Sequence, residues 1–355
     1  MSGQTTERPT ATRRSWTDVR WRAGPVAVPW IVALLMLAVS VALYPSSIKF
    51  GGLATMTPLL GVLIIASLGQ SLVIGSGGID LSVSSVVTVV GIVFVMKSAG
   101  EGGSIGVASV YASGAGLLCG IANGLLIEYI GLSPLVSTLA TGQVMAGLAN
   151  IWYGNGVNRL AVPTDWTDFT GRTLSGGISY ILIAAAVLVA LTSLILSSTV
   201  VGRRLTAAST SPQAGRYQGI SVRRYRAATY VLASLLYSVG GVLLVGSIGT
   251  PTLSLGDVYQ LSTIVVVVLG GAALSGGRLH PAATLAGAVF LAFVNQDVAA
   301  TGVAPGTQGV IQGAVLILAI LATGLGALRL LRRRRLPGAD PEPGSGHEPT
   351  AVAVT

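Results

Sequence analysis

The sequence predicts an all-α polytopic membrane protein with about ten transmembrane helices, some of them broken or re-entrant. Three observations support this fold class. Only 9% of the 355 residues are charged, against about 25% in soluble domains, and the mean hydropathy is +0.76. About ten apolar runs approach the roughly 20 residues that span a bilayer. The 48 glycines against 5 phenylalanines are typical of helices whose backbones pack closely.

The apolar runs place the spans and the flanking tails. We expect spans at 27–45, 53–75, 82–98, 105–128, 132–153, 177–198, 227–248, 258–275, 282–297 and 308–331. The first run lies too far from the N-terminus to be a signal peptide, and we interpret it as an uncleaved span. The tails at 1–26 and 332–355 carry no apolar period and are predicted to be disordered. The transmembrane domain is therefore expected at 27–331.

The placement of arginine predicts the orientation. Sixteen of the 21 Lys and Arg residues fall in three segments, 8–22, 203–226 and 329–335. An even number of predicted spans separates each pair of segments, so all three lie on one side, which the positive-inside rule makes the cytoplasm. Both termini are therefore expected in the cytoplasm. This distribution accounts for the net charge of +9 without a nucleic-acid partner.

The sequence contains no recognisable catalytic or metal-binding set. Its two lysines, Lys49 and Lys97, do not follow a G-x-x-x-x-G pattern, so we expect no P-loop. The two histidines, His280 and His347, belong to no metal-binding motif. Residues 102–106 match the pattern of a nucleophile elbow but lack its strand–turn–helix context and a histidine partner. We predict that the chain is not an enzyme and holds no metal or cofactor.

An aspartate lies between the second and third apolar runs. In GSGGIDLS (75–82), Gly77 and Gly78 free the backbone from helical dihedral angles, and Asp80 and Ser82 follow. Unwound backbone at membrane depth survives only inside protein or beside water, and a carboxylate there is a candidate functional group. Two roles stay open. Asp80 and Ser82 cap a helix that begins near Leu81, which is the favoured role, or Asp80 contacts a substrate in a translocation pathway.

A second interruption echoes the first about two hundred residues later. Gly270, Gly271, Gly276 and Gly277 break the eighth run and lead into the ninth. Both interruptions fall toward the cytoplasmic side of the predicted topology. Two broken segments in corresponding halves indicate a pathway between repeats.

Three glycines recur at every fourth residue of the fourth run. Gly116, Gly120 and Gly124 place a strip without side chains along one face of the expected helix, against which another backbone can pack. Static close packing is the favoured interpretation, and a sliding or pore-lining helix is the alternative.

The cytoplasmic segment at 200–226 contains a predicted surface helix. The pair Ser211-Pro212 is typical of a helix start, so we expect a short helix over Pro212–Gln218 with Ser211 as its cap. A plain loop that sets orientation is the alternative, but such a loop would not need a capped helix. A short helix at the membrane surface suits an intracellular partner.

Four segments of the chain resemble the permease subunits of ribose- and simple-sugar-type bacterial ABC importers. Residues 69–85, GQSLVIGSGGIDLSVSS, resemble the hallmark G-Q-x-x-V-I-x-x-G-G-I-D-L-S-V-G of that family. The segments 133–139, 202–220 and 269–278 are similar to its P-x-x-x-T-L, G-R-x-x-x-A…N-P-x-A-A-R-x-x-G-I and L-G-G-x-x-L-x-G-G-x patterns. The similarity covers roughly 50–331. The chain departs from the family at Ser84, Ser211, Gln213 and Gly215.

The resemblance implies a fold and a set of partners. The fold is that of the larger, type II-like importer permeases. The partners are a second permease of the same or a related chain, two ATP-binding-cassette domains that hydrolyse ATP, and an extracytoplasmic sugar-binding protein. The short helix would couple to the ATPase, and the matching positions in that segment are Gly202, Arg203, Pro212, Ala214, Arg216 and Gly219.

We therefore predict a multi-pass permease of the bacterial plasma membrane that moves ribose, xylose or a similar simple sugar by alternating access. The alternative is an ion- or proton-coupled secondary transporter that uses Asp80 or Asp297. Because Asp297 lies at the outer end of the ninth run, a solvated helix end is the favoured explanation for it.

Overall fold

The computed structural model describes residues 26–99 and 104–302, together with isolated positions between 306 and 318. These residues form helices and connecting segments with no β-strand, apart from an isolated antiparallel bridge between Thr173 and Ser179. The predicted all-α class is confirmed. The tails and the tenth predicted run at 308–331 fall almost entirely outside this description.

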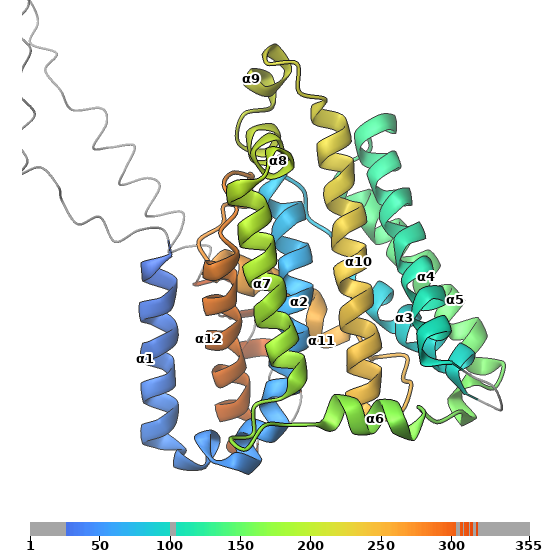
Figure 1. Ribbon diagram of the computed structural model, residues 1–355, viewed down its shortest axis with the longest axis vertical. Helices are drawn as coiled ribbons and strands as arrows, with labels where there is room; N and C mark the ends of the chain where they lie inside the picture. Colours follow the sequence, from blue (N-terminus) through green and yellow to red (C-terminus); the bar gives the residue numbers. More distant parts are fainter. Residues whose placement is uncertain are drawn as a thin grey trace, which may run out of the picture.

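Most of the helices run side by side along the long axis of the molecule (Figure 1). The helices that match the first nine predicted runs are α1 (Ala27–Leu43), α2 (Phe50–Gly75), α3 (Val83–Ser98), α4 (Ile105–Leu125), α5 (Pro134–Gly154), α7 (Tyr180–Ser198), α10 (Val222–Ile248), α11 (Asp257–Leu269) and α12 (Pro281–Ala300). Short 3-10 helices lie at Pro45–Ile48 and Val157–Arg159. A π-helical turn at Leu126–Ile130 extends α4.

Helix length separates full spans from shorter helices. Within the described part of the chain, five helices are long and apolar enough to cross a membrane, namely α2, α4 with its π turn, α7, α10 and α12, whereas α1, α3 and α11 are shorter apolar helices. The 13 residues of α11 cover only about 20 Å. The predicted span at 258–275 is therefore wrong in its length, because the helix ends at Leu269 where the paired glycines begin.

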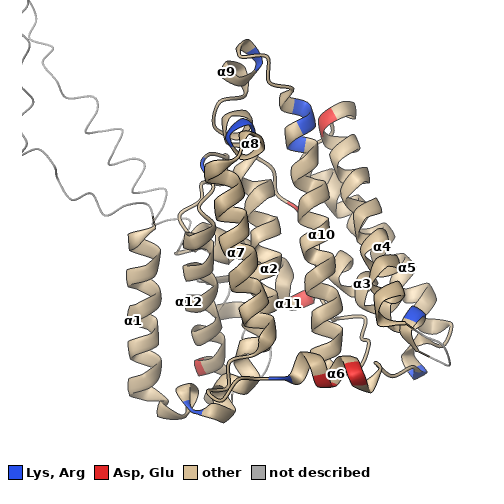
Figure 2. Ribbon diagram, viewed as in Figure 1, with Lys and Arg blue, Asp and Glu red and all other residues tan. Residues whose placement is uncertain are grey.

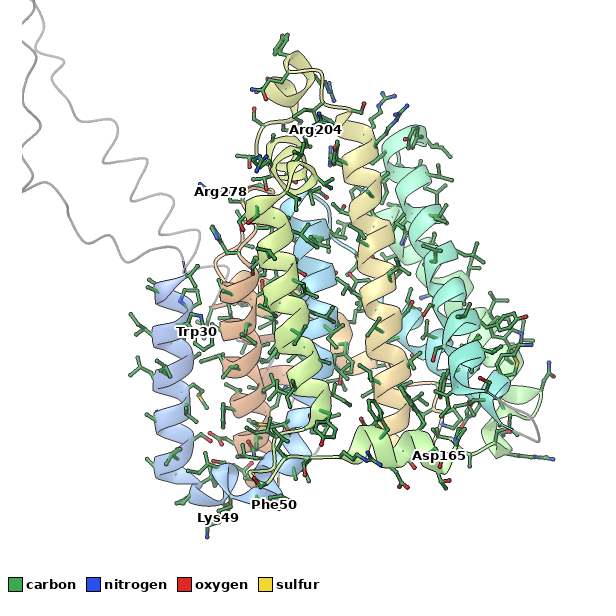
Figure 3. The ribbon with its side chains drawn as sticks, in the orientation of Figure 1. Trp30, Lys49, Phe50, Asp165, Arg204 and Arg278 are labelled. Carbon is green, nitrogen blue, oxygen red and sulfur yellow. The ribbon has the colours of Figure 1, made fainter. Side chains whose placement is uncertain are left out.

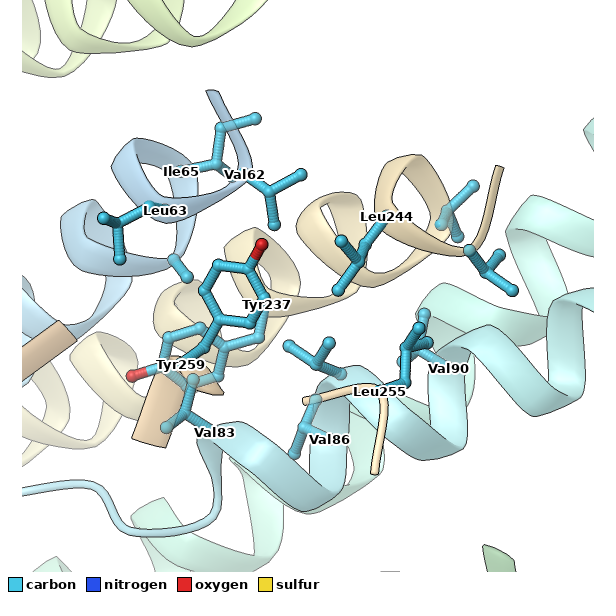
Figure 4. Packing of buried hydrophobic residues seen from close by; sticks show 14 of the residues in the cluster. Val62, Leu63, Ile65, Val83, Val86, Val90, Tyr237, Leu244, Leu255 and Tyr259 are labelled. Carbon is cyan, nitrogen blue, oxygen red and sulfur yellow. The ribbon is translucent and has the colours of Figure 1, made fainter. Parts of the chain in front are cut away.

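The core of the bundle surrounds α2. Val62, Ile64 and Leu68 of α2 are fully buried, because α7, α10, α11 and α12 all pack around this helix. Figure 4 shows Val62, Leu63 and Ile65 beside Tyr237 of α10. In contrast, α1, α4, α5 and α7 expose many aliphatic side chains, as expected where helices face lipid rather than protein.

The two ends of the bundle carry different short helices. At one end α8 (Val200–Thr210) and α9 (Pro212–Tyr217) project beyond the long helices, and at the other end α6 (Thr164–Gly171) lies across the bundle (Figure 1). Basic residues gather along α8, α9 and the start of α10 (Figure 2). Neither α6 nor α8 was expected from the sequence. Helix α6 is fixed to α10, because Trp166 Nε1 donates a hydrogen bond to Val242 O at 2.9 Å.

Candidate translocation site

The first glycine interruption ends α2 with a left-handed turn. Gly77 has φ +86°, its N–H donates to Ile74 O at 2.9 Å, and the Gly78 N–H donates to Val73 O at 3.1 Å. This is the Schellman arrangement, which favours glycine at the left-handed position. The chain then continues without helix to Ser82. The predicted break is therefore a real helix end.

Asp80 lies fully buried just before α3. Its Oδ1 accepts hydrogen bonds from the Ser82 N–H at 2.8 Å and the Ser82 hydroxyl at 2.5 Å. The helix begins at Val83 rather than near Leu81, and its N-cap, Ser82, makes no side-chain capping bond. The predicted cap is wrong in that respect. Asp80 orders the entrance to α3 without capping its first turn.

Polar side chains of α4 and α5 hold the same segment in place. The Ser82 hydroxyl accepts from Asn123 Nδ2 at 3.1 Å, and Asn123 Oδ1 accepts from the Thr141 hydroxyl at 2.6 Å. The Leu81 N–H donates to the Thr138 hydroxyl at 3.1 Å. Backbone groups that leave a helix inside a membrane protein need such partners. Asn123 and Thr141 were missed from the sequence, although an asparagine within an apolar run was an available signal, and Thr138 was noted only as part of the family pattern at 133–139.

The second interruption has the same backbone geometry as the first. Gly271 has φ +81°, its N–H donates to Val268 O at 2.8 Å, and the Ala272 N–H donates to Val267 O at 3.2 Å. The partial similarity between the two glycine segments thus corresponds to a Schellman end on α2 and another on α11.

The two interruptions contact each other through backbone. The Gly277 N–H donates to Gly75 O at 3.0 Å, and a Cβ on Gly276 would lie 3.1 Å from the same oxygen and from Gly77 Cα. Leu279 packs directly on Gly75. The sequence indicated two breaks but not that they meet. A side chain on Gly276 would force them apart.

Helices α3 and α11 also meet at their N-termini. The Ser84 hydroxyl donates to Asp257 Oδ1 at 2.9 Å, and the Gly256 N–H donates to the Thr88 hydroxyl at 3.0 Å. A Cβ on Gly256 would overlap the Ser84 carbonyl oxygen. Carboxylates are favourable at helix N-termini, so Asp257 suits both helix ends. Ser84 is one of the departures from the family pattern, and here its hydroxyl makes this contact.

A cavity of about 460 Å³ opens beside this junction. Its walls come from α2, α11, α12 and the end of α10. Aliphatic side chains form most of the lining, and the polar groups are Thr55, Tyr259, Ser262, Asn295 and Gln296. An apolar pocket with a few hydroxyl and amide groups suits a small uncharged polar solute. None of these five polar residues was identified from the sequence.

The cavity and the paired interruptions lie at different depths along α2. Leu63 is the cavity residue of α2 nearest to Gly75, and twelve residues of helix separate them by about 18 Å. Over that length α2 is buried throughout. The cavity therefore ends against a packed core, on the far side of which the two glycine turns touch.

The glycine strip of α4 packs against α10. A Cβ on Gly120 would lie 2.8 Å from Ser234 Cβ and from Tyr230 O, and one on Gly124 would lie 3.0 Å from Ala227 O. Gly116 directly contacts the Ser238 hydroxyl. Backbone oxygens are among these neighbours, so the strip lets two helix backbones approach closely.

The predicted coupling segment folds as two short helices. Gly202 packs on α7, Arg203 donates to Ser198 O at 3.1 Å, and Pro212 opens α9. Ser211 precedes it without a side-chain capping bond, so the expected serine cap is wrong. Gly219 ends α9 with φ +72°.

The surface of α9 is exposed to solvent. Ala214 and Arg216 are exposed, and Tyr217 is 93% exposed. An aromatic ring with no intramolecular packing is unusual on a polar surface and is a common anchor in protein interfaces. The sequence analysis did not single out Tyr217.

An ion pair joins α10 to the π turn after α4. Arg226 Nε lies 3.2 Å from Glu128 Oε1, and the Glu128 side chain is only 7% exposed. The guanidinium also reaches the first interruption, since Arg226 Nη2 lies 3.9 Å from the Cβ position of Gly77. Single π turns occur often at functional sites. From the sequence, Arg226 was counted only among the charges that set the membrane orientation, and its pairing with Glu128 was not predicted.

The second acidic candidate, Asp297, lies in another part of the bundle. It is only 8% exposed, and its Oδ1 accepts from the Ser40 hydroxyl of α1 at 2.7 Å. The expectation of a solvated helix end is therefore wrong. Asp80 and Asp297 are held by different helices, with no hydrogen-bonded path between them among the described residues.

A helical membrane bundle with a largely apolar cavity that carries a few polar groups, two apposed helix breaks and a projecting basic helix pair is typical of a transport permease. The sequence model of the family described as branched-chain amino acid transport system / permease component matches residues 52–320. The chain belongs to this family.

Individual relatives are similar over most of their length. The chain is 34% identical to the probable ABC transporter permease protein y4mJ of Sinorhizobium fredii, over 83% of this chain and 88% of that protein. It is 30% identical to the ribose import permease protein RbsC of Bacillus subtilis, over 82% and 91%. It is 27% identical to the galactose/methyl galactoside import permease protein MglC of Escherichia coli, over 86% and 95%. The resemblance to sugar-importer permeases is confirmed, and the chain is a multi-pass permease of the inner-membrane type.

Proposed function

We propose that this chain is the membrane pathway of a bacterial ABC importer for a monosaccharide. Two such permeases, two ATP-binding-cassette subunits and an extracytoplasmic binding protein make up the working complex. The partner subunits hydrolyse ATP, because the lysines of this chain lie in no P-loop pattern. The observation that carries the proposal is the exposed helix α9 at the place that matches the family's coupling segment.

The charge distribution supports an orientation for the importer. Basic residues of α8, α9 and α10 gather at one end of the bundle (Figure 2), which the positive-inside rule assigns to the cytoplasm. The cavity then opens toward the extracytoplasmic side, since its α2 residues lie in the half of that helix away from α8. In this orientation the cavity receives solute from the binding protein.

The cavity supports a monosaccharide as the solute. Its volume of about 460 Å³ holds a single sugar ring, and its hydroxyl and amide groups can exchange hydrogen bonds with sugar hydroxyls. The ribose and galactose importers among the relatives support the same class. The described lining contains no carboxylate, which disfavours an ion-coupled site here.

The contact between the two helix breaks supports alternating access as the transport mechanism. When ATP draws the partner subunits together, α9 moves with α10, and Arg226 carries that motion to Glu128 and Gly77. Separation of Gly75 from Gly277 then opens the cytoplasmic side. Asp80 keeps the entrance to α3 fixed during the movement through its bonds to Ser82.

Reconstituted uptake tests this proposal. The double variant Arg216→Glu, Tyr217→Ser should abolish ATP-dependent uptake of the sugar and co-purification of the ATPase, since truncating an aromatic anchor costs about 2 kcal/mol of binding, a factor of roughly thirty. Both side chains are exposed, so the unfolding temperature should not change. The matched control is Tyr180→Ser at the opposite end of the bundle.

Two results would contradict the proposal in different ways. Normal uptake by the double variant would remove α9 from the coupling role. Sugar transport into vesicles that contain the permease without any ATPase would refute the importer mechanism and favour a secondary transporter.

A further inference from the structure

A second cavity, of about 500 Å³, lies at the basic end of the bundle, away from the translocation cavity. Its wall is made by the start of α1, the end of α7, α8 and the loop that leads into α12. Its polar residues are Ser193, Ser197, Arg203, Thr206, Arg278 and His280. The described lining holds two guanidinium groups and three hydroxyls but no carboxylate. Such a set attracts an anion that accepts several hydrogen bonds.

The cavity lies at the boundary between the apolar belt and the basic end. Beside it, Val28 of α1 is 55% exposed and Leu194 of α7 is 58% exposed, as expected for side chains that face acyl chains. Helices α1 and α7 flank α12 (Figure 1), and Arg278 lies on the side of the bundle that faces α1 (Figure 3). A ligand in this cavity can place its charge on the arginines and its apolar part between α1 and α7.

Arg203 is held by a contact that leaves most of its donors available. Arg203 uses Nη1 to bind Ser198 O at 3.1 Å, which leaves its other N–H groups available. His280, the N-cap residue of α12, has a pKa below its usual value because of burial and the neighbouring charge of Arg278. At neutral pH it therefore adds a neutral hydrogen-bonding group. The first residues of α12, Pro281 and Ala282, also line the cavity, so the positive end of this helix faces it.

We propose that this cavity binds the headgroup of an anionic phospholipid, with Arg203 and Arg278 holding the phosphate and the acyl chains lying along α1 and α7. The placement beside exposed aliphatic side chains favours a lipid over a soluble phosphate. Basic pockets between membrane helices on the cytoplasmic side commonly bind such headgroups. Leu279, in the same wall, packs on Gly75, so an occupied cavity would support the contact between the two helix breaks.

Lipid binding to the purified full-length permease tests this site. Binding of phosphatidylglycerol and phosphatidylcholine is measured by native mass spectrometry or with a fluorescent lipid in neutral detergent. Wild type should prefer phosphatidylglycerol. Because an arginine close to an anionic headgroup contributes about fivefold to lipid binding, Arg203→Gln with Arg278→Gln should weaken it about 25-fold. Arg204→Gln with Arg224→Gln removes two exposed charges at the same end outside the cavity and should change binding less than about twofold.

Each further outcome decides the proposal. Equal binding of both lipids, unchanged binding by the Arg203/Arg278 variant, or equal losses in both double variants would overturn it. Displacement of the lipid by excess inorganic phosphate would show that the cavity takes a soluble anion instead. The unfolding temperature of both variants should match that of wild type, since the four arginines are exposed. Uptake is not measured here, so failure of this proposal leaves the import function untouched.

Discussion

Replacing Gly120 by alanine should separate α4 from α10. The added Cβ would lie 2.8 Å from Tyr230 O, and ordinary van der Waals contact begins near 3.4 Å, so the helices must move apart by about 0.6 Å. The neighbour is a backbone oxygen, so a change of rotamer cannot relieve the clash. Overpacking of this kind costs about 1–3 kcal/mol.

Gly114→Ala on the same helix is the matched control. Nothing lies within 4 Å of the Cβ position at Gly114, so no overpacking arises there. Both glycines are interior residues of α4, and the gain of about 1 kcal/mol in helix propensity is therefore common to both variants. The difference in unfolding free energy between the two variants should equal the overpacking cost, with Gly120→Ala the less stable.

Reversible unfolding in mixed micelles, followed by circular dichroism, measures this difference. A value of about 1–3 kcal/mol supports static close packing of the strip. Equal stability of the two variants would refute the reasoning. It would mean that α4 slides freely against α10 and would favour the sliding-helix interpretation of the glycine strip.

Two further predictions concern contacts found only in the structure. Gly256→Ala should lower both stability and sugar uptake, because a Cβ there would overlap the carbonyl oxygen of Ser84; unfolding and uptake equal to wild type would contradict the packing of α11 on α3. Arg226→Glu should abolish uptake, because it places two carboxylates side by side, and adding Glu128→Arg should restore at least part of the uptake. A double variant as inactive as the single one would show that the ion pair does not carry the coupling.

The sequence was sufficient to predict the order of the membrane helices but not the length of every one. Apolar runs are set by the membrane, so the helices from α1 to α12 that match them lie close to their predicted bounds. The exception is α11, where a run of apolar residues continued past Leu269. A hydropathy pattern does not detect a Schellman helix end, whereas the paired glycines in the sequence did indicate a break in the helix.

The two unpredicted helices have a common explanation. Helices α6 and α8 are short and lie outside the apolar runs, so neither a span signal nor a long amphipathic period indicated them. Their positions depend on tertiary and capping contacts, such as the bond from Trp166 to Val242 and the capping of α8 by Thr199 at Gly202 N. A hydroxyl cap can be recognised only once the helix start is known.

The candidate site shows the same division between local and distant information. Local signals identified Gly77, Gly271 and the start of α9, because the dihedral preferences of glycine and proline act within one turn. The bond between Gly75 and Gly277, and that between Ser84 and Asp257, join residues about two hundred positions apart. No spacing rule connects such residues in a single sequence.

The hydrogen bond that joins the two interruptions links two peptide groups, Gly277 N–H and Gly75 O, and Leu279 adds an apolar contact beside it. A closure of this kind has no chemical preference, because a peptide N–H and a carbonyl oxygen part in the same way for any solute. In the importer proposed above, selection of the solute is left to the cavity lining and to the binding protein. A lineage of such permeases can therefore exchange one sugar for another without rebuilding its closure, which requires only that the glycines remain.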